Sequence, residues 1–334
     1  MRKPLYFLNI LIQNLHFFQG KINILILKIQ LQSKQDIKYE YFGYLKQSIG
    51  KNQQIHIGHY IINYNHIKYI KNGYGIIIFN DKSIFKSNFK ENKAFGISHY
   101  INEIKNEEFI GEYYNNILYG FGIYINKRTN QKYSGYYQFD SLNGVVIEES
   151  FEQGYTYYGE YINNNKQGYG KIKWKEGTIY EGQFFRNQIS GYAIIKYPDK
   201  KIYKGQVKRA KLFGFGEFIW PEGKKFIGNY KNNKKDGFGI FLWDFPKNII
   251  NNNIGINEMK AYIGFWSEGI INGVGIKICL GKMKSGLWIN GTKIMWFEEK
   301  ELIKKYIKKN QIKYLKILLG NKEDIIKLLK KCYL

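Results

Sequence analysis

The sequence predicts an all-β repeat protein: an elongated, twisted, single-layer antiparallel sheet of stacked β-hairpins, followed by a short C-terminal α-helical segment. Three observations predict this fold. Two series of glycines recur with a period of 23 residues, aromatic residues keep the same period, and both patterns stop after Trp296. A fixed period between about 20 and 50 residues is typical of a solenoid or array, in which each repeat packs only against its neighbours.

The period is clearest in the middle of the chain. The two glycine series are Gly159, Gly182, Gly205 and Gly228, and Gly168, Gly191, Gly214 and Gly237. Aromatic residues flank the first series on both sides: Tyr157, Tyr161, Tyr180, Phe184, Tyr203, Phe226 and Tyr230. A third aromatic set follows the second glycine series: Trp174, Tyr197, Trp220 and Trp243. The shared spacing indicates that one structural unit repeats.

Each repeat is expected to form two strands joined by a turn. Aromatic residues alternate from Tyr157 to Tyr161, and the segment from Gly168 to Trp174 alternates as well, as in a half-buried strand. The polar residues 163–167 between these segments suit a hairpin turn. Glycine weakens a strand unless another group approaches its backbone closely, so we expect an aromatic ring from a neighbouring strand to lie over each bare glycine.

The repeat divides the chain into four parts. Residues 109–295 hold the regular repeats, with an insert rich in Asn and Ile at 244–260. Further members of the pattern in this part are Gly170, Gly216, Gly239, Tyr262, Gly264 and Trp266. Residues 41–108 form degenerate repeats, in which Ser87 stands where glycine is expected and His56 where an aromatic residue is expected. We expect residues 1–40 to be an N-terminal cap or poorly ordered, and residues 296–334 to form basic amphipathic helices.

The repeat resembles the MORN (membrane occupation and recognition nexus) repeat, whose pattern is Tyr-x-Gly-x-aromatic, a turn, and then Gly-x-Gly. The best copy combines the segment Tyr157–Tyr161 with Gly168-Tyr169-Gly170. Ala193 and Val146 replace the second glycine of two copies, and Val207 replaces an aromatic residue, so the sheet is expected to be locally irregular there. The resemblance implies an open array of hairpins, and some members of the family carry the repeat beside a lipid kinase or methyltransferase domain.

The N-terminus leaves three alternatives open. Arg2 and Lys3 precede an apolar run that ends near Ile12, and polar residues interrupt it before it could span a membrane. The segment is therefore an extra strand or cap, a membrane-touching segment, or a targeting signal.

The C-terminal segment leaves two alternatives open. Leu302 and Tyr306, and Leu315 and Leu319, fall at the i, i+4 spacing of a helix, and Asn321 suits a helix N-cap. The lysine-rich opposite side is then either the solvated face of a helical hairpin that closes the sheet, or a basic amphipathic surface for a membrane or a partner groove.

The charge balance is the strongest sequence indication of a partner. The chain has 52 Lys and Arg against 27 Asp and Glu, a formal net charge of +25 that attracts polyanions. The candidate anion- or lipid-binding residues are Lys171, Lys173, Lys196, Lys201, Lys224, Lys225, Lys304, Lys305, Lys308 and Lys309. Nucleic acid is not expected, although lysines beside aromatic rings are also used to bind single strands, because the rings here have a structural role in the repeat.

The sequence does not indicate catalysis. The Gly-x-Gly segments are followed by no helix and no Lys-Ser/Thr, so they are repeat glycines and no phosphate loop is expected. His56, His59 and His66 have no cysteine or acidic residue at metal-ligand spacing, so no metal or other cofactor is expected. Cys279 and Cys332 are far apart and unpatterned, which favours reduced thiols in a cytoplasmic protein.

Three functional hypotheses follow. The first is a non-catalytic scaffold that links a membrane or cytoskeletal structure, including a cilium, to protein partners. The second is a direct binder of anionic phospholipids such as phosphoinositides. The third, which rests on the family resemblance, is a regulatory fragment of a MORN-repeat lipid kinase. A second copy of the chain could pair at the open end of the sheet.

Overall fold

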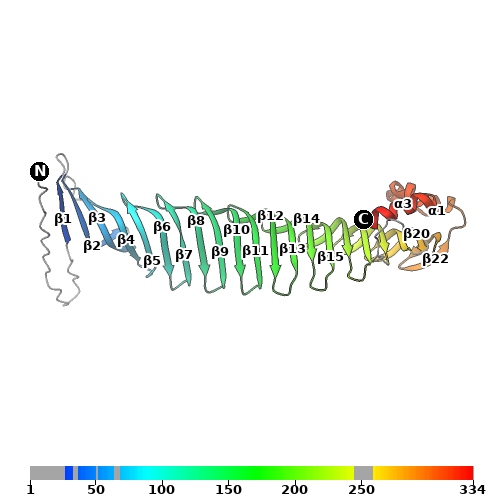
Figure 1. Cartoon of the computed structure of the whole chain (residues 1–334), viewed down its shortest axis with the longest axis horizontal. Helices are drawn as coiled ribbons and strands as arrows, with labels where there is room; N and C mark the ends of the chain where they lie inside the picture. The colour runs from blue at the N-terminus through cyan, green and yellow to red at the C-terminus, as the bar shows by residue number, and fades with distance from the viewer. Residues whose placement is uncertain (1–26, 33–36, 50–51, 64–67, 244–258, 334) are drawn as a thin grey trace, which may run out of the picture. The chain divides into compact units, whose positions relative to one another are not determined.

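A computed structural model describes residues 27–32, 37–49, 52–63, 68–243 and 259–333 of the chain (Figure 1). These residues fall into two compact units, an N-terminal unit up to Asn165 and a C-terminal unit from Lys166. The segment 1–26 and most of the insert, 244–258, lie outside the described residues, so the alternatives for them stay predictions.

The N-terminal unit is an antiparallel sheet in which each strand pairs with the next one along the chain (Figure 1). Its strands are β1 (Leu27–Gln32), β2 (Ile37–Ile49), β3 (Asn52–Asn63), β4 (Lys68–Phe79), β5 (Ile84–Lys90), β6 (Lys93–Asn102), β7 (Glu107–Tyr114), β8 (Ile117–Asn126), β9 (Gln131–Gln138), β10 (Ser141–Ser150) and β11 (Tyr155–Ile162).

The C-terminal unit repeats this order of hairpins and ends in helices. Its strands are β12 (Asn165–Trp174), β13 (Ile179–Phe185), β14 (Gln188–Lys196), β15 (Ile202–Lys208), β16 (Lys211–Ile219), β17 (Lys225–Lys231), β18 (Lys234–Leu242), β19 (Lys260–Ser267), β20 (Ile270–Cys279), β21 (Lys282–Ile289) and β22 (Thr292–Trp296). The helices are α1 (Glu301–Tyr306), the 3-10 helix η2 (Lys309–Tyr314), α2 (Leu315–Leu318) and α3 (Lys322–Tyr333). The predicted antiparallel sheet of hairpins with a short C-terminal helical segment is therefore confirmed.

Aromatic rings lie over bare glycines, but the prediction that each ring comes from a neighbouring strand is only partly right, because a ring also covers the glycine two residues along its own strand. Gly205 pairs with Gly216 across β15 and β16, and the Tyr203 ring covers both. A Cβ added to Gly205 would lie 2.5 Å from the Gly216 Cα, and one added to Gly216 would lie 2.6 Å from Cε2 of Tyr203. Real Cβ atoms do not approach other atoms so closely, so only glycine lets the ring and the two backbones meet.

The same rings connect each hairpin to the next. Tyr203 contacts Tyr230 edge-on at 5.5 Å between ring centroids, and Phe226 contacts Trp266 at 5.4 Å. In the N-terminal unit, Phe109 contacts Tyr137 in the same way at 5.2 Å. Edge-to-face pairs of this kind contribute roughly 0.5–1.5 kcal/mol beyond their buried area. A hairpin therefore needs its neighbour to complete the packing of its own rings.

The first glycine of each Gly-x-Gly segment has a different role from the one expected. Gly191 lies at φ +113°, at a bulge where the register between β13 and β14 shifts. The Gln183 side chain covers it and accepts a hydrogen bond of 2.8 Å from the Tyr192 amide. The prediction that an aromatic ring lies over this glycine is therefore wrong. It is required because L-residues rarely adopt that backbone conformation.

Two-residue turns close most hairpins, and they hold neighbouring hairpins together. Asn232 and Asn233 occupy one such turn with φ of +49° and +68°. The Asn233 side chain accepts a hydrogen bond of 2.7 Å from the Leu212 amide, and its own amide donates to the Leu212 carbonyl at 3.1 Å. Asn or Asp makes the same pair of bonds at other turns: Asn92, Asn116, Asp140, Asn164 and Asn187.

Two repeats place a polar side chain on the packed side of the sheet. In the first, His56 stands in the place of an aromatic residue: its ring lies over Gly58 and Gly75 and is buried edge-on to Phe89, with 5.2 Å between ring centroids. Burial, with a smaller effect of nearby Lys71, lowers the pKa of His56 to about 4. In the second, the buried carboxylate of Glu148 accepts hydrogen bonds of 2.6 Å from Tyr155 and 2.5 Å from Tyr161.

The turn at Ala210 provides a direct test of the interlocking bonds. Ala210 lies at φ +57° and makes only the backbone bond, to the Ile189 carbonyl. Ala210→Asn should raise stability by about 1 kcal/mol, because it adds the missing side-chain bond and favours the left-handed conformation. Asn233→Ala should lower it by about 2 kcal/mol. Asn88→Ala, at an exposed strand position, is the control, and chemical denaturation measures all three. Equal stability of the Ala210→Asn variant and the wild type would contradict the role given to these turns.

The buried histidine predicts an acid-dependent loss of stability. The pKa of His56 is about 4 in the folded chain and about 6.5 unfolded, so the unfolded chain takes up the proton first as the pH falls. The stability that this histidine provides is present above pH 6.5 and is lost between pH 6.5 and 4, by up to roughly 3 kcal/mol. His56→Phe should remove this part of the pH dependence. Parallel stability curves for variant and wild type over that range would contradict the assignment.

Candidate interaction surface

The two faces of the sheet have different chemistry. The packed face carries the rings over glycines, such as Tyr203 over Gly216, and the opposite face, here called the open face, carries the residue between the two glycines of each Gly-x-Gly segment. Aromatic residues at this middle position are half exposed at Tyr74, Phe121, Tyr169, Tyr192 and Phe215. The side chains of the packed face are therefore buried within the sheet's own packing. The side chains of the open face are the ones accessible to a partner.

One row of paired residues crosses the open face of the C-terminal unit and changes character along it. Its members, in strand order, are Lys171, Glu181, Ile194, Lys204, Glu217, Ile227, Ile240, Ile263, Ile276 and Ser285. The first half is mixed and charged, and the second half is apolar. The helices pack against the part of the row where the residues are apolar.

The C-terminal helices cover the apolar half of this face. Ile303, Leu318, Ile325 and Leu329 are buried in one cluster with Ile240, Ile263 and Ile276 of the sheet. Tyr314 stacks on Phe238, with 4.2 Å between centroids and 8° between planes, and meets Phe265 edge-on at 5.6 Å. Figure 1 shows α1 and α3 beside this end of the sheet. Most of the apolar side chains of the helices are therefore already packed against the sheet, and Ile312 of η2 stays 52% exposed.

The candidate lysine Lys225 lies at the border of this cluster and is buried. Its ammonium group pairs with Glu217 at 2.8 Å and donates a hydrogen bond of 2.9 Å to the Cys332 carbonyl near the end of α3. Lys225 therefore ties the last helix to the sheet. The expectation that it contacts an anionic ligand is not supported by its burial.

The other candidate lysines of the sheet do not form one basic strip. Lys171 pairs with Glu181 at 2.8 Å, and Lys201 pairs with Asp199 at 2.7 Å. Lys173 and Lys196 are exposed in one cross-strand row with Ile179 between them. Lys224 is half exposed beside buried Lys225. Two of these five lysines therefore already have a carboxylate beside them, which partly neutralises their charge.

The four candidate lysines of the helices are different, because all of them are exposed. Lys304 pairs with Glu301 at 3.0 Å. Lys305, Lys308 and Lys309 form no ion pair among the residues that the structure describes. Lys304 and Lys305 lie on α1, Lys308 directly precedes η2, and Lys309 begins it. We call these four exposed residues the helical lysine surface (Lys304, Lys305, Lys308 and Lys309).

The open face of the N-terminal unit is exposed and apolar across five strands. Its members are 39–56% exposed: Ile110, Phe121, Tyr136, Val145, Ile147 and Tyr158. They are neighbours by strand pairing: Phe121 faces Tyr136, and Ile147 faces Tyr158. We call these six residues the aromatic patch. Contiguous exposed apolar surface of this kind marks a site of interaction in soluble proteins.

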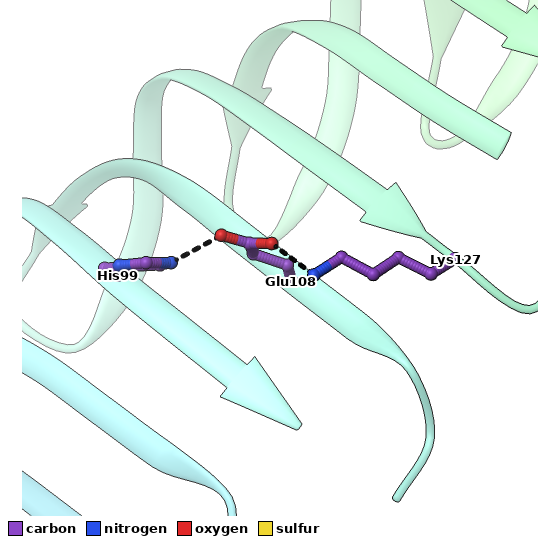
Figure 2. A network of polar contacts seen from close by, with 3 residues as sticks. All are labelled: His99, Glu108 and Lys127. Carbon is purple, nitrogen blue, oxygen red and sulfur yellow. Dashed lines mark hydrogen bonds and ion pairs between the residues drawn. The ribbon is translucent and has the colours of Figure 1, made fainter. Parts of the chain in front are cut away.

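A polar network borders the aromatic patch. The Glu108 carboxylate on β7 is 2.8 Å from Nε2 of His99 on β6 and 3.0 Å from the ammonium group of Lys127 (Figure 2). Hydrogen bonds from Lys127 and His99 lower the pKa of Glu108. Lys132 and Glu149 form a further pair at 3.2 Å. An apolar centre with a charged border is the usual arrangement of a protein interface.

Lys235 is a further residue that the sequence does not single out. Its ammonium group lies 4.3 Å from the centroid of the Phe241 ring, 4.6 Å from that of Trp266 and 5.0 Å from that of Phe226. Burial lowers the pKa of Lys235 to about 8. The rings that enclose it come from three strands, and only strand pairing shows that they converge. The ammonium group of Lys235 therefore occupies the aromatic cage that these rings form.

Two kinds of feature are absent from the described residues. No group of three or more His, Cys, Asp or Glu side chains there could hold a metal ion. No helix of the described residues is long and apolar enough to cross a membrane. What the structure presents instead are surfaces, namely the aromatic patch and the helical lysine surface.

Comparison with known proteins identifies the same repeat. The family model described as the MORN repeat matches residues 157–179, 180–201, 203–225, 226–244 and 262–279. No curated protein matches the chain. Among solved structures, the chain is similar to the SAS-4 (dCPAP) TCP domain in complex with a proline-rich motif of Ana2 (dSTIL) of Drosophila melanogaster. The identity is 13% and the TM-score 0.25, with 66% of this chain and 100% of that chain covered. The segment from residue 157 to residue 279 therefore consists of five MORN repeats, interrupted by the insert.

Proposed function

We propose that this chain is a non-catalytic scaffold of the cytoplasm that binds protein partners on its open face and associates with an anionic membrane through the helical lysine surface. The orientation of the helices is the main observation that supports the proposed membrane contact. Their apolar residues Ile303, Leu318 and Ile325 are buried against the sheet, whereas Lys305, Lys308 and Lys309 face solvent.

This arrangement distinguishes two kinds of membrane contact. An amphipathic helix that enters a membrane buries its apolar face among the lipids. Here most of that face packs against Phe238 and its neighbours, so the lysines, with the half-exposed Ile312, are the groups that remain for a membrane. The contact is then electrostatic and peripheral, and long-range attraction by the net charge of +25 supports it.

Vesicle sedimentation tests the lysine contact. The triple variant Lys305→Glu, Lys308→Glu, Lys309→Glu should bind phosphatidylserine vesicles roughly 100-fold more weakly at low salt, since each lysine near an anionic surface is worth about 1 kcal/mol. Wild-type binding should weaken as salt is raised, because salt screens exposed charges.

A matched triple variant controls for overall charge. Lys90→Glu, Lys93→Glu and Lys175→Glu remove equal charge at exposed positions away from the helices. This variant should bind far better than the helix variant. Equal losses would show a contact without a defined site, and no binding of the wild type at low salt would exclude a direct lipid contact. A fluorescent tag in the source cell would then show whether the chain lies at a cytoskeletal or ciliary structure instead.

A further inference from the structure

We propose that the aromatic patch of the N-terminal unit (Ile110, Phe121, Tyr136, Val145, Ile147 and Tyr158) is the docking site for an amphipathic α-helix of a partner protein, which inserts an aromatic side chain over Phe121 and Tyr136. This inference deepens the proposed scaffold function, because it names the surface and the kind of partner.

The chain contains an occupied version of the same surface. Phe121 is the middle residue of a Gly-x-Gly segment, and it faces Tyr136 across β8 and β9. Phe238 and Phe265 hold the same two repeat positions and face each other across β18 and β19. The Tyr314 ring covers that second pair, and Phe238 and Phe265 are only 8% and 2% exposed. Phe121 and Tyr136 are 52% and 48% exposed.

The covering element identifies the chemistry of the occupant. At the C-terminal unit it is a run of short helices that places Tyr314 over the aromatic pair and buries Leu318 and Ile325 beside it. A helix with one aromatic residue and flanking apolar residues at i, i+3 or i+4 spacing supplies the same contacts. The chain's own helices are held at their site by Lys225 and cannot cover both surfaces at once.

The aromatic patch is bordered by two polar residues at positions where the covered surface has apolar ones, and this difference favours a partner that can dissociate. Ser134 stands where the covered surface has Ile263, and Lys132 stands where it has Ala261. Both replacements leave polar groups that water can solvate when the surface is empty. The border contains charges of both signs, Glu108 and Lys127 among them, so it can pair with a helix that carries mixed charges along its edges.

A helical peptide of defined chemistry tests the proposal on the full chain. The probe is a lactam-bridged, fluorescently labelled helix with one tyrosine between two leucines at i, i+4 spacing, and its control has serine in place of the tyrosine. The probe should bind saturably, and the control peptide about tenfold more weakly. The double variant Phe121→Ser, Tyr136→Ser should also lose about tenfold or more in affinity, because exposed aromatic side chains at the centre of an interface carry most of its binding energy.

A matched surface variant and two further measurements separate the alternatives. Phe139→Ser removes an aromatic side chain that is 68% exposed at the adjacent turn, and it should leave binding unchanged. Thermal unfolding of the double variant should show a cooperative transition with only a small loss of stability, since both side chains are about half exposed. Failure of the probe to bind, or binding that the double variant does not reduce, overturns the proposal. Sedimentation that shows dimers dependent on Phe121 and Tyr136 overturns it in favour of a second copy.

This test is independent of the vesicle experiment. Binding of the peptide tests the aromatic patch, and binding of the vesicles tests the helical lysine surface. Loss of probe binding in the Phe121→Ser, Tyr136→Ser variant with unchanged vesicle binding supports the patch alone. Vesicle binding without probe binding leaves the scaffold's membrane contact intact and overturns the helix-docking site.

Discussion

The close approach of two glycine backbones beneath an aromatic ring is the contact on which the rest of the structure depends. Where Gly205 meets Gly216 under Tyr203, a single methyl group would collide with the ring or with the opposite backbone. The same ring then meets Tyr230 of the next hairpin. One contact therefore fixes the register within a hairpin and the packing between hairpins. This is why the glycines and rings share one period.

That constraint also explains how the N-terminal unit tolerates irregular repeats. Ser87 and Ser98 stand where two glycines would face each other, and their hydroxyl groups form a hydrogen bond of 2.7 Å in the buried space. His56 and Glu148 replace apolar groups on the packed face, and the tyrosines around Glu148 satisfy its carboxylate. A polar substitution is kept where a neighbouring strand supplies a partner, because a buried polar group without one is costly.

The sequence predicts the hairpins and the ring seats well because both follow from a local period. It does not predict contacts between side chains that are far apart in the chain and lie outside the period. The hydrogen bond from Lys225 to the Cys332 carbonyl requires knowing that α3 returns to the sheet, and the cage around Lys235 requires the strand order. The left-handed conformation of Gly191 and its equivalents is likewise not visible in the period, because it depends on the bulge in the strand pairing.

The open face carries the functional differences because the packed face has no freedom to vary. The paired glycine positions hold glycine or, in a few repeats, a compact residue such as Ala193 or Val146, whereas the row from Lys171 to Ile276 changes from charged to apolar without disturbing the strand pairing. The apolar half of that row determines where the chain's own helices pack, and their packing turns Lys305, Lys308 and Lys309 toward solvent. The fold thus places an aromatic surface and a basic surface on separate units. A substitution on one can alter its partner without loss of the other.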